Sequence, residues 1–190
     1  MNFFLPKTVD IDGAKYSIRY DYRVILEIIT MLSDTDLKPE EKGMAILEMF
    51  YVDYEKIRNV QEAIEKCYWF IDCGNESKKN NSPRLMDWEQ DFPYIIAPVN
   101  RVLGYDARGV DYDVDSNTGG LHWWTFVSAY MEIGADTTIS QIISLRSKMK
   151  KGKKLEKWER EWIRSNYDAV HIHTNYSDTE NEIINQWTKG

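Results

Sequence analysis

The chain has 190 residues, a hydrophobic fraction of 43%, a charged fraction of 29% and a formal net charge of −7. This length suits one domain with a buried core, and the balance of residue types excludes a chain that is disordered throughout. The negative charge argues against a protein whose main task is to neutralise phosphates. No apolar run approaches the roughly eighteen residues of a membrane-spanning helix, so we expect a cytoplasmic protein without a membrane partner.

The first predicted element is a β-hairpin over residues 8–19. Polar and apolar residues alternate on both sides of Asp12-Gly13, a dipeptide typical of two-residue turns. Two strands alone are marginally stable in water, so the hairpin should lie on the helices that follow it.

Apolar residues at helical spacing predict helices through most of the remaining chain. We expect the first to be capped by Asp21, the second to open at Pro39, and a third to run from a cap at Asp53 to a stop at Gly74. A fourth should begin at Asp91.

The fourth predicted helix contains Pro98, which should kink it or divide it in two. The apolar segment 121–134 predicts a central helix, because it is apolar around most of its circumference. The next helix should begin after a cap at Asp136 or Thr137 and end at Gly152. The last helix is indicated by the apolar stripe Leu155, Trp158 and Trp162.

Two polar segments, 75–84 and 104–120, are predicted to be exposed loops, and 167–190 a polar C-terminal tail. The first loop is an insertion and not a domain boundary, because neither side of it makes a full core alone. The predicted fold is therefore mainly α. It is a single bundle-like domain over 1–166, with six to seven helices and an N-terminal β-hairpin.

Metal-binding patterns are weak. His171 and His173 would point to the same side of an extended segment, but no cysteine cluster or HExxH spacing accompanies them. The aspartates of the second loop resemble a calcium loop, yet Ser116 and His122 stand where the EF-hand pattern needs glycine and glutamate. We expect two exposed tail histidines, a solvated acidic loop formed around Asp106, Asp111, Asp113 and Asp115, and no metal.

Catalytic signals are equally thin. The chain has no GxSxG sequence, no phosphate-binding glycine loop and no cysteine with a histidine in a known motif. Cys67 and Cys73 lie six apart on one predicted helix and its end, so both should be reduced thiols. Glu132 should pair with a cation of a neighbouring helix and not act as a general acid or base. We therefore expect no enzyme and no cofactor.

The most informative segment is the aromatic sequence Leu121-His-Trp-Trp-Thr-Phe-Val-Ser-Ala-Tyr-Met-Glu-Ile-Gly134, followed within twenty residues by a basic run. Residues 146–160 contain eight basic and two acidic side chains, a net charge of +6. We name residues 148–157 the lysine elbow. The predicted core positions here are Trp123, Trp124, Phe126, Val127, Tyr130 and Met131, with Glu132 in the same motif and Trp158 and Trp162 packing from the last helix.

The lysine elbow is the candidate partner-binding site. Its cations are Lys148, Lys150, Lys151, Lys153, Lys154 and Lys157. Lysines and tryptophans together could bind nucleic acid, but an acidic partner helix suits the same surface, and the tryptophans share an apolar stripe with Leu155. We favour a protein partner over nucleic acid.

Four motifs carry a family resemblance: Asp21-Tyr-Arg23, Trp69-Phe-Ile-Asp-Cys-Gly74, the aromatic sequence 121–134, and Lys151-Gly-Lys-Lys-Leu-Glu-Lys-Trp-Glu-Arg160. Together they resemble the gene-product-fifteen family of siphophage proteins, from the hairpin to Asn166. Members of that family are encoded in the tail module, between the major tail protein and the tape measure protein.

The resemblance implies a role in phage tail morphogenesis, since that gene position is the one of tail assembly chaperones. Such a protein would bind the tape measure protein, together with other tail assembly proteins, while the tail tube polymerises. It would act in the cytoplasm of the bacterial host and be absent from the mature virion. Two alternatives stay open, a structural tail or connector component and a nucleic-acid-binding accessory protein that uses 146–160. A homo-oligomer is also possible.

Overall fold

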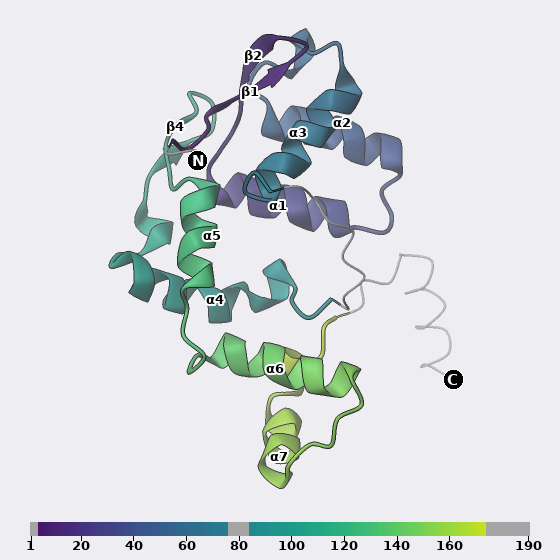
Figure 1. The fold of residues 1–190 in the computed structure, drawn as a ribbon, viewed down its shortest axis with the longest axis vertical. Helices are drawn as coiled ribbons and strands as arrows, with labels where there is room; N and C mark the ends of the chain where they lie inside the picture. The colour runs from purple at the N-terminus through teal and green to yellow at the C-terminus, as the bar shows by residue number, and fades with distance from the viewer. Residues whose placement is uncertain (1–3, 76–83, 174–190) are drawn as a thin grey trace, which may run out of the picture.

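Eight α-helices and two β-hairpins make up the part of the chain that the computed structural model describes, residues 4–75 and 84–173 (Figure 1). The predicted mainly α class with an N-terminal hairpin is confirmed. Most of the first predicted loop, and the tail residues Ile183, Ile184 and Trp187, lie outside the described residues. The helices are α1 (Tyr22–Ser33), α2 (Pro39–Phe50), α3 (Val60–Ile71), α4 (Trp88–Leu103), α5 (Trp123–Met131), α6 (Thr138–Lys150), α7 (Lys157–Ser165) and α8 (Tyr167–Val170), with short 3-10 turns η1 (Tyr54–Lys56) and η2 (Ala107–Gly109). None of them combines the length and apolar composition that a membrane crossing requires.

The N-terminal hairpin pairs β1 (Thr8–Ile11) with β2 (Ala14–Ser17) in antiparallel register. Asp12 and Gly13 have φ values of +50° and +78°, the left-handed backbone that a tight two-residue turn requires. The hairpin lies on α3, because the Asn59 side chain donates to Asp12 Oδ1 at 3.0 Å. Its buried side chains, Val9 and Ile11, join the helical core.

The start of the third predicted helix differs from the prediction. Asp53 precedes only the short turn η1, and α3 begins at Val60, where the Asn59 side chain accepts the Glu62 N–H. Asn and Asp are comparable N-caps, so the spacing of apolar residues alone could not choose between them. Val60 and Tyr68 of this helix are exposed, although both are apolar or aromatic.

Helix α4 is longer and more continuous than predicted. It begins at Trp88, capped by Asp87, and runs without interruption through Pro93 and Pro98. Each proline removes a backbone donor, which normally weakens a helix interior. Here Ile95, Ile96 and Val99 are buried beside the prolines, so packing against the core offsets the lost hydrogen bonds.

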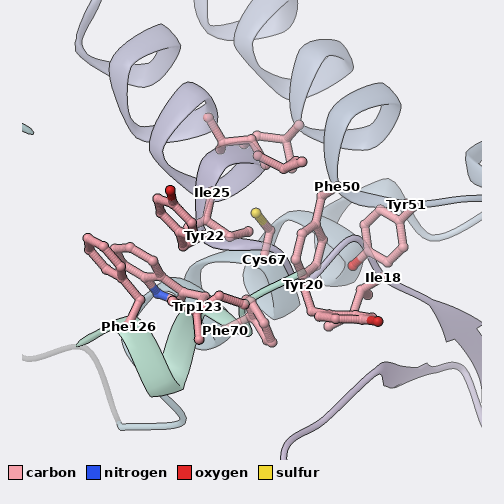
Figure 2. Packing of buried hydrophobic residues seen from close by; sticks show 14 of the residues in the cluster. Ile18, Tyr20, Tyr22, Ile25, Phe50, Tyr51, Cys67, Phe70, Trp123 and Phe126 are labelled. Carbon is pink, nitrogen blue, oxygen red and sulfur yellow. The ribbon is translucent and has the colours of Figure 1, made fainter. Parts of the chain in front are cut away.

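One cluster of buried side chains extends from Val9 in the hairpin to Ile139 in α6. Figure 2 shows its centre, where Tyr22 of α1 lies beside Phe126 of α5 with stacked rings 4.6 Å apart. The Cys67 thiol is buried in the same cluster, and burial raises its pKa to about 12. Cys73 is partly buried and its thiol pKa is raised to about 11, chiefly by burial. Both cysteines are free, as expected.

The segment 104–120 is folded back onto the start of α1. It contains η2 and a second hairpin, β3 (Tyr112–Asp113) with β4 (Thr118–Gly119). The buried carboxylate of Asp21 holds this segment in place, because it accepts from Leu121 N at 2.8 Å and from Arg23, whose guanidinium also donates to the Val110 carbonyl. Most of the segment is exposed, but it is anchored and carries backbone structure that its irregular sequence did not predict.

A glycine in this anchored segment yields a stability prediction. Gly120 has φ of +79°, and a Cβ there would collide with the Asp21 carboxylate. Gly104 has the same φ of +79° but open space around it. Gly104→Ala should therefore cost only the left-handed backbone penalty of about 1–2 kcal/mol, whereas Gly120→Ala should cost at least about 1 kcal/mol more because the Asp21 contacts must shift. Urea unfolding measures both free energies, and equal losses would contradict the account of this contact.

Candidate functional site

The lysine elbow is built by a helix ending. At the end of α6, Gly152 takes a left-handed φ of +60° and donates its N–H to the Met149 carbonyl. The next residue, Lys153, donates its N–H to the Lys148 carbonyl at 2.9 Å. This pair of bonds is the Schellman motif, which satisfies the last carbonyls of a helix and needs a residue such as glycine at the left-handed position. The backbone therefore reverses within a few residues and presents consecutive lysines outward.

The elbow cations fall into two groups. Lys148 is paired with Glu159 of α7 at 2.5 Å, and Lys157 lies 4.0 Å from Glu161. The Lys148 ammonium, hydrogen-bonded to Glu159, lowers the pKa of that carboxyl. The other four lysines are exposed and make no ion pair with any described residue: Lys150, Lys151, Lys153 and Lys154.

Arg146, one of the basic residues of the 146–160 run, does not belong to this surface. Its side chain is only 4% exposed and forms a two-pronged pair with Asp91 of α4, with N–O distances of 2.6 and 2.9 Å. It also donates to the carbonyls of Leu85, Ala169 and Val170. The net charge read from the sequence therefore overstates the charge available to a partner.

The predicted core packing of the α7 tryptophans is wrong for one of them. Trp158 is 55% exposed, and Trp162 is partly buried. The buried residue of α7 is Glu159, which accepts from Lys148, so an ion pair connects this helix to α6. In Figure 1, α7 projects beyond α6 at one end of the molecule.

The aromatic helix α5 is bound to the end of α3. Trp123 Nε1 donates to the Ile71 carbonyl and Trp124 Nε1 to the Phe70 carbonyl, both at 2.9 Å. Carbonyls at a helix end lack partners within the helix, and the indoles supply donors to two of them. The Phe70 carbonyl also accepts the Cys73 N–H at 3.1 Å. The Trp123-Trp124 and Trp69 to Gly74 motifs are thus two sides of one contact. Gly74 allows it, since a Cβ there would lie 3.0 Å from the Trp124 ring.

The end of the aromatic motif leaves the core. Trp123 and Phe126 are buried, whereas Tyr130 is partly buried. Met131, predicted to be core, is 74% exposed. Glu132 is the C-terminal cap of α5, exposed, and without a cationic partner among the described residues. The helix is shorter than the apolar run: it ends at Met131, Glu132 is exposed, and Ile133 is partly buried against the core.

The family described as Bacteriophage Gp15 protein matches residues 1–171 of the chain. The chain belongs to this family. No curated protein and no solved structure matches it.

The Gp15 match extends past Asn166, where the predicted domain ended, and the structure gives the reason. Residues 167–170 form α8, whose Val170 is buried and whose carbonyls accept from Arg146. Gln90 of α4 binds the following residues, donating to the His171 carbonyl and accepting the His173 N–H at 2.9 Å. The C-terminal part of the Gp15 region is therefore packed on α4 and α6 and is not a free tail.

The two tail histidines and the aspartates make no visible metal site among the described residues. The His171 ring stacks on Tyr167 with centroids 3.9 Å apart. Asp106 is bound to Arg108, and Asp113 Oδ1 accepts the N–H groups of Asp115 and Ser116. Within residues 4–75 and 84–173, no group of three or more His, Cys, Asp or Glu side chains is arranged to hold a metal ion.

His122 has a role that the sequence did not indicate. It is 6% exposed and caps α5, with Nδ1 accepting the Trp124 N–H at 3.1 Å. Its Nε2 lies 2.9 Å from the Pro6 carbonyl, which fixes the proton on Nε2. Burial lowers the pKa of His122, and nearby Lys7 adds to this effect. Histidine is not among the residues preferred at the N-cap of a helix, so the sequence rules for helix starts do not identify it.

We therefore expect the Gp15 fold to lose stability as the pH falls below about 6.5. The unfolded chain then binds a proton on His122 that the folded state resists, so the free energy of unfolding should fall by up to about 1.4 kcal/mol per pH unit. His122→Asn keeps a capping oxygen and removes the titrating group. Urea titrations from about pH 7.5 to about pH 5.5 should give a flatter profile for the variant. Equal slopes would contradict this role.

Proposed function

We propose that this Gp15 protein is a tail assembly chaperone that binds the tape measure protein while the tail tube polymerises. Membership of a bacteriophage family supports the phage context. The tail-module gene position that the sequence resemblance implies supports the assembly role. The proposed function needs no catalysis, and it takes place in the cytoplasm of the bacterial host before the mature virion leaves.

The observation that carries the proposal is the outward group of lysines in the elbow. Lys150, Lys151, Lys153 and Lys154 stand exposed on a chain whose net charge is −7. Because their charges are not used inside the described fold, they are available to an acidic face of a partner helix. Attraction between exposed charges speeds encounter and selects partners while leaving the complex weak enough to separate. A chaperone that tube subunits must replace needs such a contact.

The test is co-expression with the tape measure protein, followed by pull-down and a measurement of how much tape measure protein stays soluble. The wild-type chain should retain it and raise its soluble fraction. Lys153→Glu with Lys154→Glu should reduce retention roughly tenfold, because two attractive charges become repulsive. Lys148 and Lys157 are left intact, since each has an acidic neighbour within α7.

Lys15→Glu with Lys38→Glu is the matched control. Both residues are exposed and lie outside the elbow, and the variant has the same change in net charge. Retention should stay near the wild-type level. Equal losses in both variants, or no association of the wild-type chain, would overturn the proposal. Detection of the protein in purified particles by mass spectrometry would favour a structural tail component, and a salt-sensitive gel shift lost in the elbow variant would favour nucleic acid.

A further inference from the structure

An open apolar groove runs along α1 and α4. Its volume is about 550 Å³, and its apolar lining includes Leu26 and Met31 of α1 with Trp88 and Phe92 of α4. These four side chains are only partly buried, although they pack against the core on their inner sides. A groove of this kind, between two helices, suits one more apolar helix face.

The rim of the groove is acidic. Glu27 of α1 and Glu89 of α4 are exposed and line it. Arg23 also lines it, but its guanidinium is held by Asp21 and the Val110 carbonyl, with N–O distances of 2.8 to 3.1 Å to the carboxylate. The cation is therefore already neutralised, and the groove presents a net negative rim around an apolar floor.

The same chain carries a surface with the opposite character. Trp158 of α7 is 55% exposed and stands directly after Lys157, and Lys154 lies four residues before it in the chain. On the other side of the short helix lie the exposed cations Arg160 and Arg164. α7 is thus a helix with an exposed aromatic side chain, and its three cations outnumber its two acidic side chains, Glu159 and Glu161.

We propose that α7 of one copy of this protein docks in the α1–α4 groove of a second copy. The exposed indole would enter the groove beside Trp88 and Phe92, and the cations near it would face Glu27 and Glu89. Opposite charge on the two surfaces favours this occupant over an acidic segment. The inference goes beyond the proposed function and does not depend on the tape measure protein.

The geometry makes this contact head-to-tail. Figure 1 places α7 beyond α6 at one end of the molecule, whereas α1 and α4 lie nearer its middle. α7 is bound to its own α6 through Lys148 and Glu159, so it remains outward and away from its own groove. Two different surfaces that bind each other produce rings or open chains of copies and not only closed dimers.

The test uses the purified full-length chain alone, in sedimentation velocity over a concentration series from about 1 to 300 µM. The wild-type protein should form dimers and larger species as its concentration rises. Trp158→Ala should weaken self-association roughly thirtyfold, the loss typical of a central aromatic residue at an interface. Glu27→Lys with Glu89→Lys should weaken it to a similar degree by repelling α7. All three side chains are exposed, so circular dichroism should show folded variants.

Mixing the two variants is the decisive experiment. The Trp158→Ala chain retains an intact groove, and the double-lysine chain retains an intact α7. In the mixture, α7 of the double-lysine chain can therefore dock in the groove of the Trp158→Ala chain, whereas the reverse contact is lost. The mixture should give a 1:1 dimer and nothing larger. A wild-type chain that stays monomeric, or variants that associate like the wild type, would overturn the proposal. So would self-association that appears only after residues 174–190 are removed, because the groove would then be the binding site of the chain's own C-terminal segment.

Discussion

Replacing Arg146 by methionine should destabilise the fold by about 3–5 kcal/mol, the loss typical of breaking a buried ion pair by removing one partner. The substitution leaves the Asp91 carboxylate, which is 0% exposed, without its cation. It also leaves the Leu85, Ala169 and Val170 carbonyls without their donor. Urea unfolding measures the loss, and hydrogen exchange should report earlier opening of α8.

The matched control is Arg101→Met. Arg101 lies 3.7 Å from Asp136, but the two side chains are 57% and 76% exposed, and a pair in water contributes about 0–1 kcal/mol. The double variant Arg146→Met with Asp91→Leu should lose less unfolding free energy than the sum of the two single variants, because it leaves no unpaired buried carboxylate at position 91. Equal losses for Arg146→Met and Arg101→Met would show that the α4–α6 contact is not held by this pair.

Replacing Trp123 by alanine should cost about 3–5 kcal/mol. The indole is 2% exposed, packs against Trp88 and Phe126, and donates to the Ile71 carbonyl. Its loss creates a cavity in the centre of the core and removes the indole donor of the Ile71 carbonyl. Thermal and urea unfolding of the purified variant give the free energy directly.

Trp158→Ala provides the contrast, since the same chemical change is made at a side chain that is 55% exposed. Its unfolding free energy should stay within about 0.5 kcal/mol of the wild type at dilute protein. If Trp158→Ala were as destabilising as Trp123→Ala, the exposed placement of α7 would be wrong. The pair therefore tests which tryptophans form the core and which remain available for contacts.

Local signals predicted the fold class because they are carried by neighbouring residues. The Asp12-Gly13 turn, the Asp21 cap and the Pro39 start all appear where the sequence places them. The continuous course of α4 through Pro98 was not predictable, because packing that offsets a missing donor comes from helices distant in the sequence.

The candidate site was predicted only in part, for a related reason. The lysines of the elbow are contiguous, so the turn at Gly152 that exposes them can be read from the sequence. Arg146 lies in the same run, yet its partner Asp91 stands 55 residues away. Trp158 shares a stripe with Trp162, and no local pattern indicates that Trp158 is exposed while Glu159 is buried in an ion pair with Lys148.

The most direct test of the proposed chaperone role is hydrogen exchange on the full-length chain, with and without co-purified tape measure protein. We expect slower exchange in residues 148–157, where the exposed lysines contact the partner, and little change in the β1–β2 hairpin. Binding that leaves the elbow unprotected would contradict the proposed surface. Failure of the two proteins to co-purify would contradict the chaperone role itself.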